Sequence, residues 1–89
     1  MLHEVKTVNP FFNDQWVKKK NFEVRKNNRD YRVKDIFVST EFNSQDQTFT
    51  DRVIYFKIVY VLDNPDFCKE GFVILGLKEI TRSRTVLRS

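Results

Sequence analysis

The sequence predicts an α+β fold: a small, strongly bent sheet or barrel of about five strands, with one N-terminal helix packed against it. Three observations lead to this prediction. Apolar and polar residues alternate in five separate segments, as they do in half-buried strands. A helix-start signal follows the first of these segments. The composition combines nine Phe with only two Gly and two Pro, which favours a packed core over disorder.

The length of 89 residues fits one domain. We place this domain at residues 3–81 and expect a basic C-terminal tail over residues 82–89, frayed from Thr81 onward. The alternating segment 2–8 is expected to form the first strand. Asn9 and Pro10 follow it, and these residue types favour the cap and first turn of a helix. The helix should therefore begin here and run to about Lys19.

Four more strands are expected over residues 21–25, 35–42, 52–62 and 71–80. Successive side chains of a strand point to opposite faces. In the 21–25 strand, Phe22 and Val24 should enter the core, while Glu23 and Arg25 share the other face. In the 52–62 strand, one unbroken apolar face is expected from Ile54, Phe56, Ile58, Tyr60 and Leu62.

Positive charge is concentrated in one part of the chain. Between Lys18 and Asp35 there are eight cations and three anions, a net of +5, whereas the remaining residues together carry −1. Such clustering is typical of a protein that binds a polyanion. A solvated charged face is the alternative interpretation.

Other residue counts exclude several kinds of chemistry. The single cysteine, Cys68, cannot form an internal disulfide, and the only histidine, His3, is far from it in sequence. We therefore expect neither a Cys/His nucleophile nor a Cys/His zinc cluster, and we predict no metal and no cofactor. No apolar run approaches the ~20 residues of a membrane span, and residues 1–6 lack the apolar region of a signal peptide. A cytoplasmic protein without a membrane partner is expected.

The segment Lys20-Asn21-Phe22-Glu23-Val24-Arg25 resembles the motif Gly-x-Lys-x-x-Glu-x-Arg of the ASCH domain superfamily, a group of PUA-like β-barrels. More closely, the chain resembles DUF3850, a family of small phage and bacterial proteins. This resemblance rests on residues 3–6, 10–12, 20–35, 49–52 and 71–77. The chain departs from the family at Lys18, Lys34 and Asp51, three positions where the family usually has Gly.

The resemblance implies a pocket between the helix and the barrel wall, and it implies binding of RNA or a nucleotide. Lys20, Glu23 and Arg25 would line this pocket. Phosphate contacts are expected from Lys18, Lys19, Lys26 and Arg29, and an exposed base would stack on Tyr31 or Trp16. The sequence does not indicate an oligomeric state.

Two alternatives remain open at this stage. The first is a small amidohydrolase acting on an N4-acylated cytidine or a similar modified nucleoside, with Lys20 and Glu23 as catalytic residues. A branch with a similar motif has this activity and uses a lysine, a threonine and a distant glutamate. Here Glu23 stands at the threonine position, which argues against a simple transfer. The second is a protein-interaction factor or anti-host phage factor without a ligand pocket.

Overall fold

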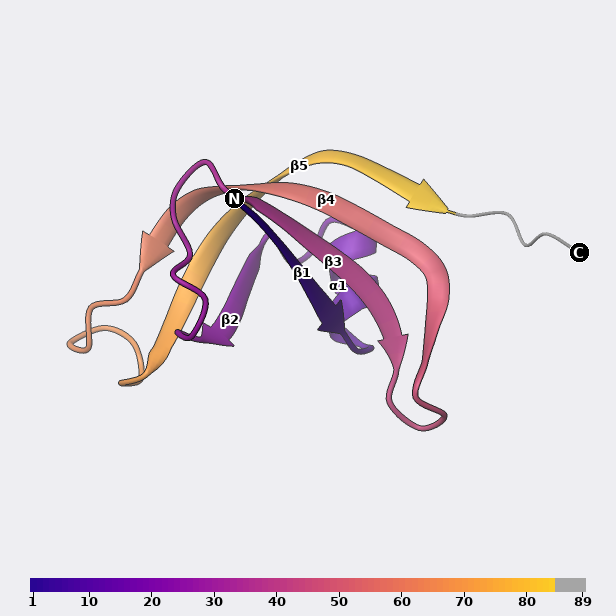
Figure 1. Cartoon of the computed structure of the whole chain (residues 1–89), viewed down its shortest axis with the longest axis horizontal. Helices are drawn as coiled ribbons and strands as arrows, with labels where there is room; N and C mark the ends of the chain where they lie inside the picture. The colour runs from indigo at the N-terminus through magenta and orange to yellow at the C-terminus, as the bar shows by residue number, and fades with distance from the viewer. Residues whose placement is uncertain (85–89) are drawn as a thin grey trace, which may run out of the picture.

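Five strands form a single sheet that curls into a half-barrel over one short helix (Figure 1). This computed structural model describes residues 1–84. Its elements are β1 (Leu2–Thr7), α1 (Phe11–Trp16), β2 (Phe22–Lys26), β3 (Ile36–Asn43), β4 (Thr48–Leu62) and β5 (Phe72–Arg84). The strand order is β1-β3-β4-β5-β2, so β1 and β2 form the two edges. Strand β1 runs parallel to β3, and all other pairs are antiparallel.

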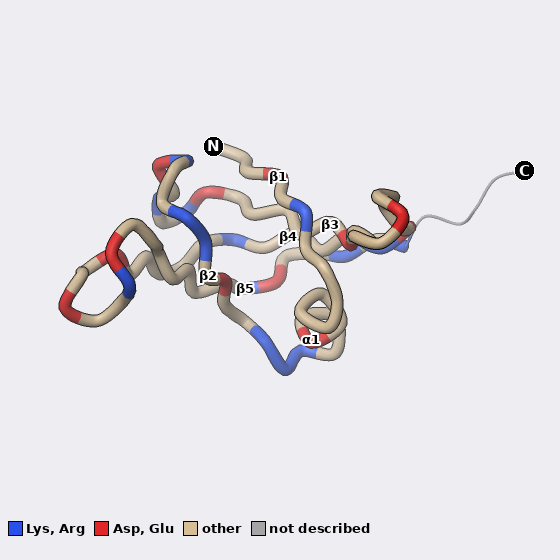
Figure 2. Tube along the Cα trace, turned by 90° about the horizontal axis from the view of Figure 1, so that it is seen from below, with Lys and Arg blue, Asp and Glu red and all other residues tan. Residues whose placement is uncertain are grey.

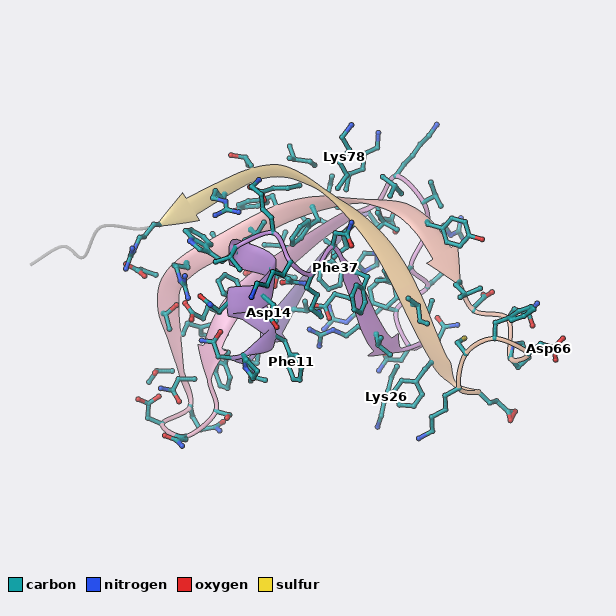
Figure 3. All side chains as sticks on the ribbon, turned by 180° about the vertical axis from the view of Figure 1, so that it is seen from behind. Phe11, Asp14, Lys26, Phe37, Asp66 and Lys78 are labelled. Carbon is teal, nitrogen blue, oxygen red and sulfur yellow. The ribbon has the colours of Figure 1, made fainter. Side chains whose placement is uncertain are left out.

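The core fills the concave side of the half-barrel. Phe37 lies beneath the arch of strands, whereas Lys78 points away from its convex side (Figure 3). The largest fully buried apolar side chains are Phe12, Phe37, Ile54, Ile58, Leu75 and Val73. They come from α1, β3, β4 and β5, so the helix closes a core that the sheet alone would leave open.

The helix begins where the sequence predicts but is shorter than expected. The side-chain oxygen of Asn9 accepts a hydrogen bond from the backbone N–H of Asn13 at 2.8 Å. The peptide bond between Asn9 and Pro10 is cis. The helix ends at Trp16 rather than near Lys19, because Lys18 has a left-handed backbone with φ of 67° that breaks the helical run.

Strand β4 does not keep one apolar face along its whole length. Its first part follows the prediction, with Ile54 and Ile58 buried. A register shift against β5 between Ile58 and Tyr60 then moves the following side chains to the opposite face. Tyr60 is 62% exposed, and the predicted unbroken face is wrong beyond Ile58. Gly76 lies opposite Tyr60, where an added Cβ would come within 3.1 Å of the Tyr60 Cβ.

The expectation of a frayed end from Thr81 is wrong for the residues that the structure describes. Strand β5 continues to Arg84, which pairs with Arg52 of β4. Arg82 donates two hydrogen bonds to Glu79, and its guanidinium lies 4.3 Å from the centre of the Trp16 ring. Residues 85–89 of the predicted basic tail lie outside the described residues.

Two of the three positions where the resemblance implies glycine have left-handed backbone. Lys18 has φ of 67° and Lys34 has φ of 81°, whereas Asp51 has no such conformation. Left-handed φ values crowd the Cβ of an L-residue and cost roughly 1–2 kcal/mol. At both lysines the fold therefore uses a conformation that glycine adopts more easily.

Replacing Lys34 by glycine should stabilise the protein. Lys34→Gly removes the Cβ strain, and the entropy of glycine offsets part of the gain, so we expect the free energy of unfolding to rise by about 0.5 kcal/mol. Urea unfolding measures this change. Lys34→Ala is the matched control, because it removes the same charge but keeps the Cβ. Equal stability of the Gly and Ala variants would contradict the prediction.

An ion pair between Glu41 of β3 and Arg52 of β4 joins these two strands close to the start of α1. The Arg52 guanidinium donates two hydrogen bonds of 2.8 Å to Glu41, whose carboxylate also accepts from Thr50 and Asn9. These bonds, those from Arg52 above all, lower the pKa of Glu41 to about 2. Arg52 also lies 4.8 Å from the centre of the Trp16 ring.

Acid should therefore destabilise the fold through Glu41. A carboxyl group with a lowered pKa contributes stability above its unfolded pKa, and the contribution is lost as the pH falls through the folded pKa. We expect the free energy of unfolding to decrease from about pH 5 to about pH 2, measured by urea titration. Glu41→Gln should flatten this slope, whereas Glu70→Gln, an exposed control, should not. An unchanged slope in Glu41→Gln would refute the assignment.

Candidate functional site

The faces of strand β2 are the reverse of the prediction. Glu23 is buried and Arg25 is half-buried, whereas Phe22 and Val24 are 42% and 51% exposed. Glu23 and Arg25 do share a face, as expected, but this face points into the half-barrel. The apolar pattern of the strand is misleading because the interior offers polar partners here, and buried polar groups are stable where such partners exist.

The structure brings together the three residues of the motif. The Lys20 Nζ lies 3.3 Å from the Glu23 Oε1, and the Arg25 Nε lies 3.6 Å from the same oxygen. The side chain of Glu23 is only 5% exposed, against 14% for Lys20 and 28% for Arg25. One sheltered carboxylate is thus flanked by two cations that retain some contact with solvent.

A chain of buried hydrogen bonds connects Arg25 to Glu23 through the interior. Gln15 of α1 donates to the Glu23 Oε2 at 2.9 Å and accepts from the Ser39 hydroxyl at 2.7 Å. The Ser39 and Thr7 hydroxyls are 2.7 Å apart, and Arg25 donates to the Thr7 hydroxyl at 3.3 Å. Because Ser39 has one hydroxyl proton, which goes to Gln15, Thr7 must donate to Ser39.

Two arginines bridge the open edges of the half-barrel. The Arg25 guanidinium donates to the backbone carbonyl of Lys6, and the Arg29 guanidinium donates to that of Glu4, each at 3.0 Å. Strands β1 and β2 are not hydrogen-bonded to each other as a strand pair. The Arg25 and Arg29 side chains therefore span the space between them. We call this junction of β1 and β2 the seam.

A cavity of about 730 Å³ lies between α1 and β2, and we call it the α1–β2 cavity. Lys20, Glu23 and Arg25 line it together with Lys6, Thr7, Asp14 and Lys19, and Phe11, Phe22 and Val24 contribute apolar surface. The Lys20 Nζ lies 5.2 Å from the centre of the Phe22 ring and 6.0 Å from that of Phe11. The cavity therefore combines aromatic surface with a charged polar group, the usual composition of a small-ligand site.

The other predicted contact residues lie in different surroundings. Lys19 lines the α1–β2 cavity, whereas Lys18 pairs with Glu79 at 3.4 Å. Lys26, Arg29 and Tyr31 line a second cavity at the seam. Tyr31 is only 6% exposed, since its ring packs 4.6 Å from that of His3 and 6.2 Å from that of Phe37. Trp16 is held by Arg52 and Arg82, so its ring already has cationic partners.

The sequence interpretation missed several residues of the site. Phe11 and Phe22 are the exposed aromatic rings of the α1–β2 cavity. Thr7, Gln15 and Ser39 are polar residues that the fold buries almost completely. The only available signal was the four-residue spacing of Phe11 and Gln15, which places them on one side of a helix.

His3 belongs to a separate buried cluster. Its Nε2 lies 2.8 Å from the Asp35 Oδ2, and the amino group of Met1 lies 3.0 Å from the Asp35 Oδ1. The hydrogen bond with His3 is the largest cause that lowers the pKa of Asp35 to about 2. This cluster stabilises the start of β1 against the residue preceding β3.

Two further findings concern residues 1–84. No group of three or more His, Cys, Asp or Glu side chains in this range is arranged to hold a metal ion. Over the same residues, no helix has the length and apolar character needed to cross a membrane. Cys68 is a free thiol, with its sulfur 3.6 Å from the carbonyl oxygens of Leu62 and Phe72.

Breaking the buried chain at Ser39 should destabilise the fold. Ser39→Ala leaves the Gln15 carbonyl oxygen and the Thr7 hydroxyl without their partner, at a cost of about 1–3 kcal/mol in the free energy of unfolding. Urea unfolding measures this loss. Ser44→Ala, the same change at an exposed hairpin position, should change the value by less than about 0.5 kcal/mol. Similar losses in the two variants would contradict the prediction.

Comparison with known proteins identifies a family. The family described as Domain of unknown function (DUF3850) matches residues 2–77. No match is found among curated proteins. The matched range includes α1, β1–β4, the first part of β5 and every residue of the α1–β2 cavity. Because this range covers most of the 89 residues, the chain belongs to the DUF3850 family.

Proposed function

We propose that the chain is a PUA-like module that binds RNA or a nucleotide and holds one base in the α1–β2 cavity. The observation that supports this most is the position of Glu23. Its carboxylate is sheltered from bulk solvent, is oriented by Gln15 and Lys20, and lines a cavity with exposed aromatic rings. An oriented carboxylate beside aromatic rings suits a flat ligand that carries an amino group.

Each part of the cavity has a role in this proposal. The Glu23 carboxylate accepts a hydrogen bond from the exocyclic amino group of the base, while Lys20 donates to a ring carbonyl or nitrogen. Phe11 and Phe22 present rings on which the base stacks, which contributes roughly 1–3 kcal/mol per base in single-strand binding proteins. The proposal thus assigns base stacking to Phe11 and Phe22. Tyr31 and Trp16, from which stacking was expected, are packed against other side chains.

The charge around the cavity supports a ligand with phosphates. Figure 2 shows blue segments in the connection between α1 and β2 and along β2. Lys19 and Lys20 line the α1–β2 cavity, and Arg25 lies between it and the seam. A polyanion is attracted to such a surface, and its binding releases counterions and weakens with salt.

RNA binding should depend on Lys20 more than on other lysines. Lys20→Ala removes a sheltered charge beside Glu23, so we expect about tenfold weaker binding of labelled single-stranded RNA. Fluorescence anisotropy at two salt concentrations measures the dissociation constant. Lys78→Ala, the same charge change on the convex side, should alter it less than about twofold. No binding at low salt, or equal effects of the two substitutions, would refute the proposal.

A second candidate is amide hydrolysis of an N4-acylated cytidine. One observation favours it: Lys20 and Glu23 form a sheltered pair with 3.3 Å between Nζ and Oε1, an arrangement suited to moving a proton to or from water. The Thr7 hydroxyl is engaged by Arg25 and Ser39, so a serine-type or threonine-type nucleophile is not free at this site. Water would therefore have to be the nucleophile.

Incubation with N4-acetylcytidine separates the two candidates. If the chain is a hydrolase, cytidine should appear by chromatography and be lost in both Lys20→Ala and Glu23→Gln. If the site only binds, N4-acetylcytidine should remain intact at high protein concentration. Turnover that persists in both variants would mean that another site carries the activity.

A further inference from the structure

The second cavity lies at the seam, on the other side of Arg25 from the α1–β2 cavity. It has a volume of about 720 Å³ and is lined mainly by residues of β1, β2 and the connection that follows β2, with Thr40 of β3 and Phe49 of β4. We call it the seam cavity. Arg25 and Lys6 line both cavities. The two spaces are therefore adjacent, with one guanidinium between them.

The charge of the seam cavity is almost entirely positive. Its lining includes four cations, Lys6, Arg25, Lys26 and Arg29, and one anion, Glu4. Figure 2 shows blue segments on both β1 and β2, the strands that border the seam. Across residues 1–84, Lys6, Lys26 and Arg29 form no salt bridge with a carboxylate. Three cations without an internal counter-ion thus gather in one hollow.

The remaining polar groups of the seam cavity fit an anion. Burial raises the pKa of the Tyr31 hydroxyl, which keeps it protonated and able to donate a hydrogen bond. Arg29 uses one guanidinium nitrogen on the Glu4 carbonyl, and this group has further N–H donors. Guanidinium and ammonium groups converging on one site bind phosphate strongly, because the hydrogen bonds are charge-assisted.

From this geometry we infer that the seam cavity is a phosphate subsite, which holds the phosphate attached to the nucleoside in the α1–β2 cavity. The inference rests on the proposed function and makes it more specific. The ligand is a nucleotide, free or at an RNA end, rather than an unphosphorylated nucleoside. Arg25 would contact the ligand where base and phosphate portions meet, since it lines both cavities.

Calorimetry with matched ligands tests the inference. We compare cytidine with cytidine monophosphate, and adenosine with adenosine monophosphate. In at least one pair, the monophosphate should bind about tenfold more tightly, as expected for one or two added charge-assisted hydrogen bonds. Inorganic phosphate alone should bind more weakly than the monophosphate, because it gains nothing from the α1–β2 cavity.

Variants locate the phosphate. Lys26→Met should abolish most of the difference in affinity between monophosphate and nucleoside, while leaving nucleoside affinity unchanged. The Lys26 side chain makes no hydrogen bond within residues 1–84, so its removal should not disturb the fold. Arg29→Met should act in the same direction, but it also removes the bridge to β1. Lys78→Met, the same charge change as Lys26→Met on the convex side, should have no effect. Glu23→Gln should weaken nucleoside and monophosphate equally.

The outcomes distinguish this inference from the proposed function. If nucleosides bind but monophosphates bind no more tightly, the phosphate subsite is refuted and the base site stands. If Lys26→Met and Lys78→Met reduce the advantage equally, the effect is general electrostatics and the subsite is likewise refuted. If no nucleoside or monophosphate binds while single-stranded RNA does, this inference fails and the proposed RNA binding stands. If RNA does not bind either, both fail.

Discussion

The burial of the Glu23 carboxylate is the constraint on which the rest of the site depends. A carboxylate removed from water is costly unless it is paired and hydrogen-bonded. Here Gln15 of α1 donates a hydrogen bond to the Glu23 carboxylate. Lys20 and Arg25, which precede and follow Glu23 in sequence, place two positive charges beside it. Satisfying one carboxylate therefore fixes α1 against β2, and it creates the cavity between them.

The buried chain of polar groups extends this constraint across the half-barrel. Ser39 belongs to β3 and Thr7 to β1, so the hydrogen bonds that orient Glu23 reach the opposite edge of the sheet. Arg25 completes the path by donating to Thr7 and to the Lys6 carbonyl. The polar chain comes from α1, β1, β2 and β3, whereas β5 holds β2 in the sheet and β4 contributes mainly apolar core.

Much of the fold follows from local pattern, and much of the site does not. The five strands and the start of the helix are visible in the alternation of residues and in the Asn9-Pro10 pair, because these depend on neighbours in sequence. The inversion of β2 and the change of face in β4 are not visible. Glu23 points inward because Gln15 and Ser39 lie there, and only the tertiary fold brings them together. The change of face in β4 results from a register shift where Tyr60 lies opposite Gly76; a glycine inside a strand suggests a bend or a close approach, but it does not show which strand changes face.

The arginine bridges at the seam have a consequence for the behaviour of the protein in a crowded solution. An edge strand with free carbonyl groups is a template on which another chain can add a strand, and this is a common route to aggregation. In this half-barrel, the edges of β1 and β2 face each other, and guanidinium groups occupy the Glu4 and Lys6 carbonyls. The same positive charges that suit an anionic ligand thus protect an incompletely closed barrel from pairing with its own copies.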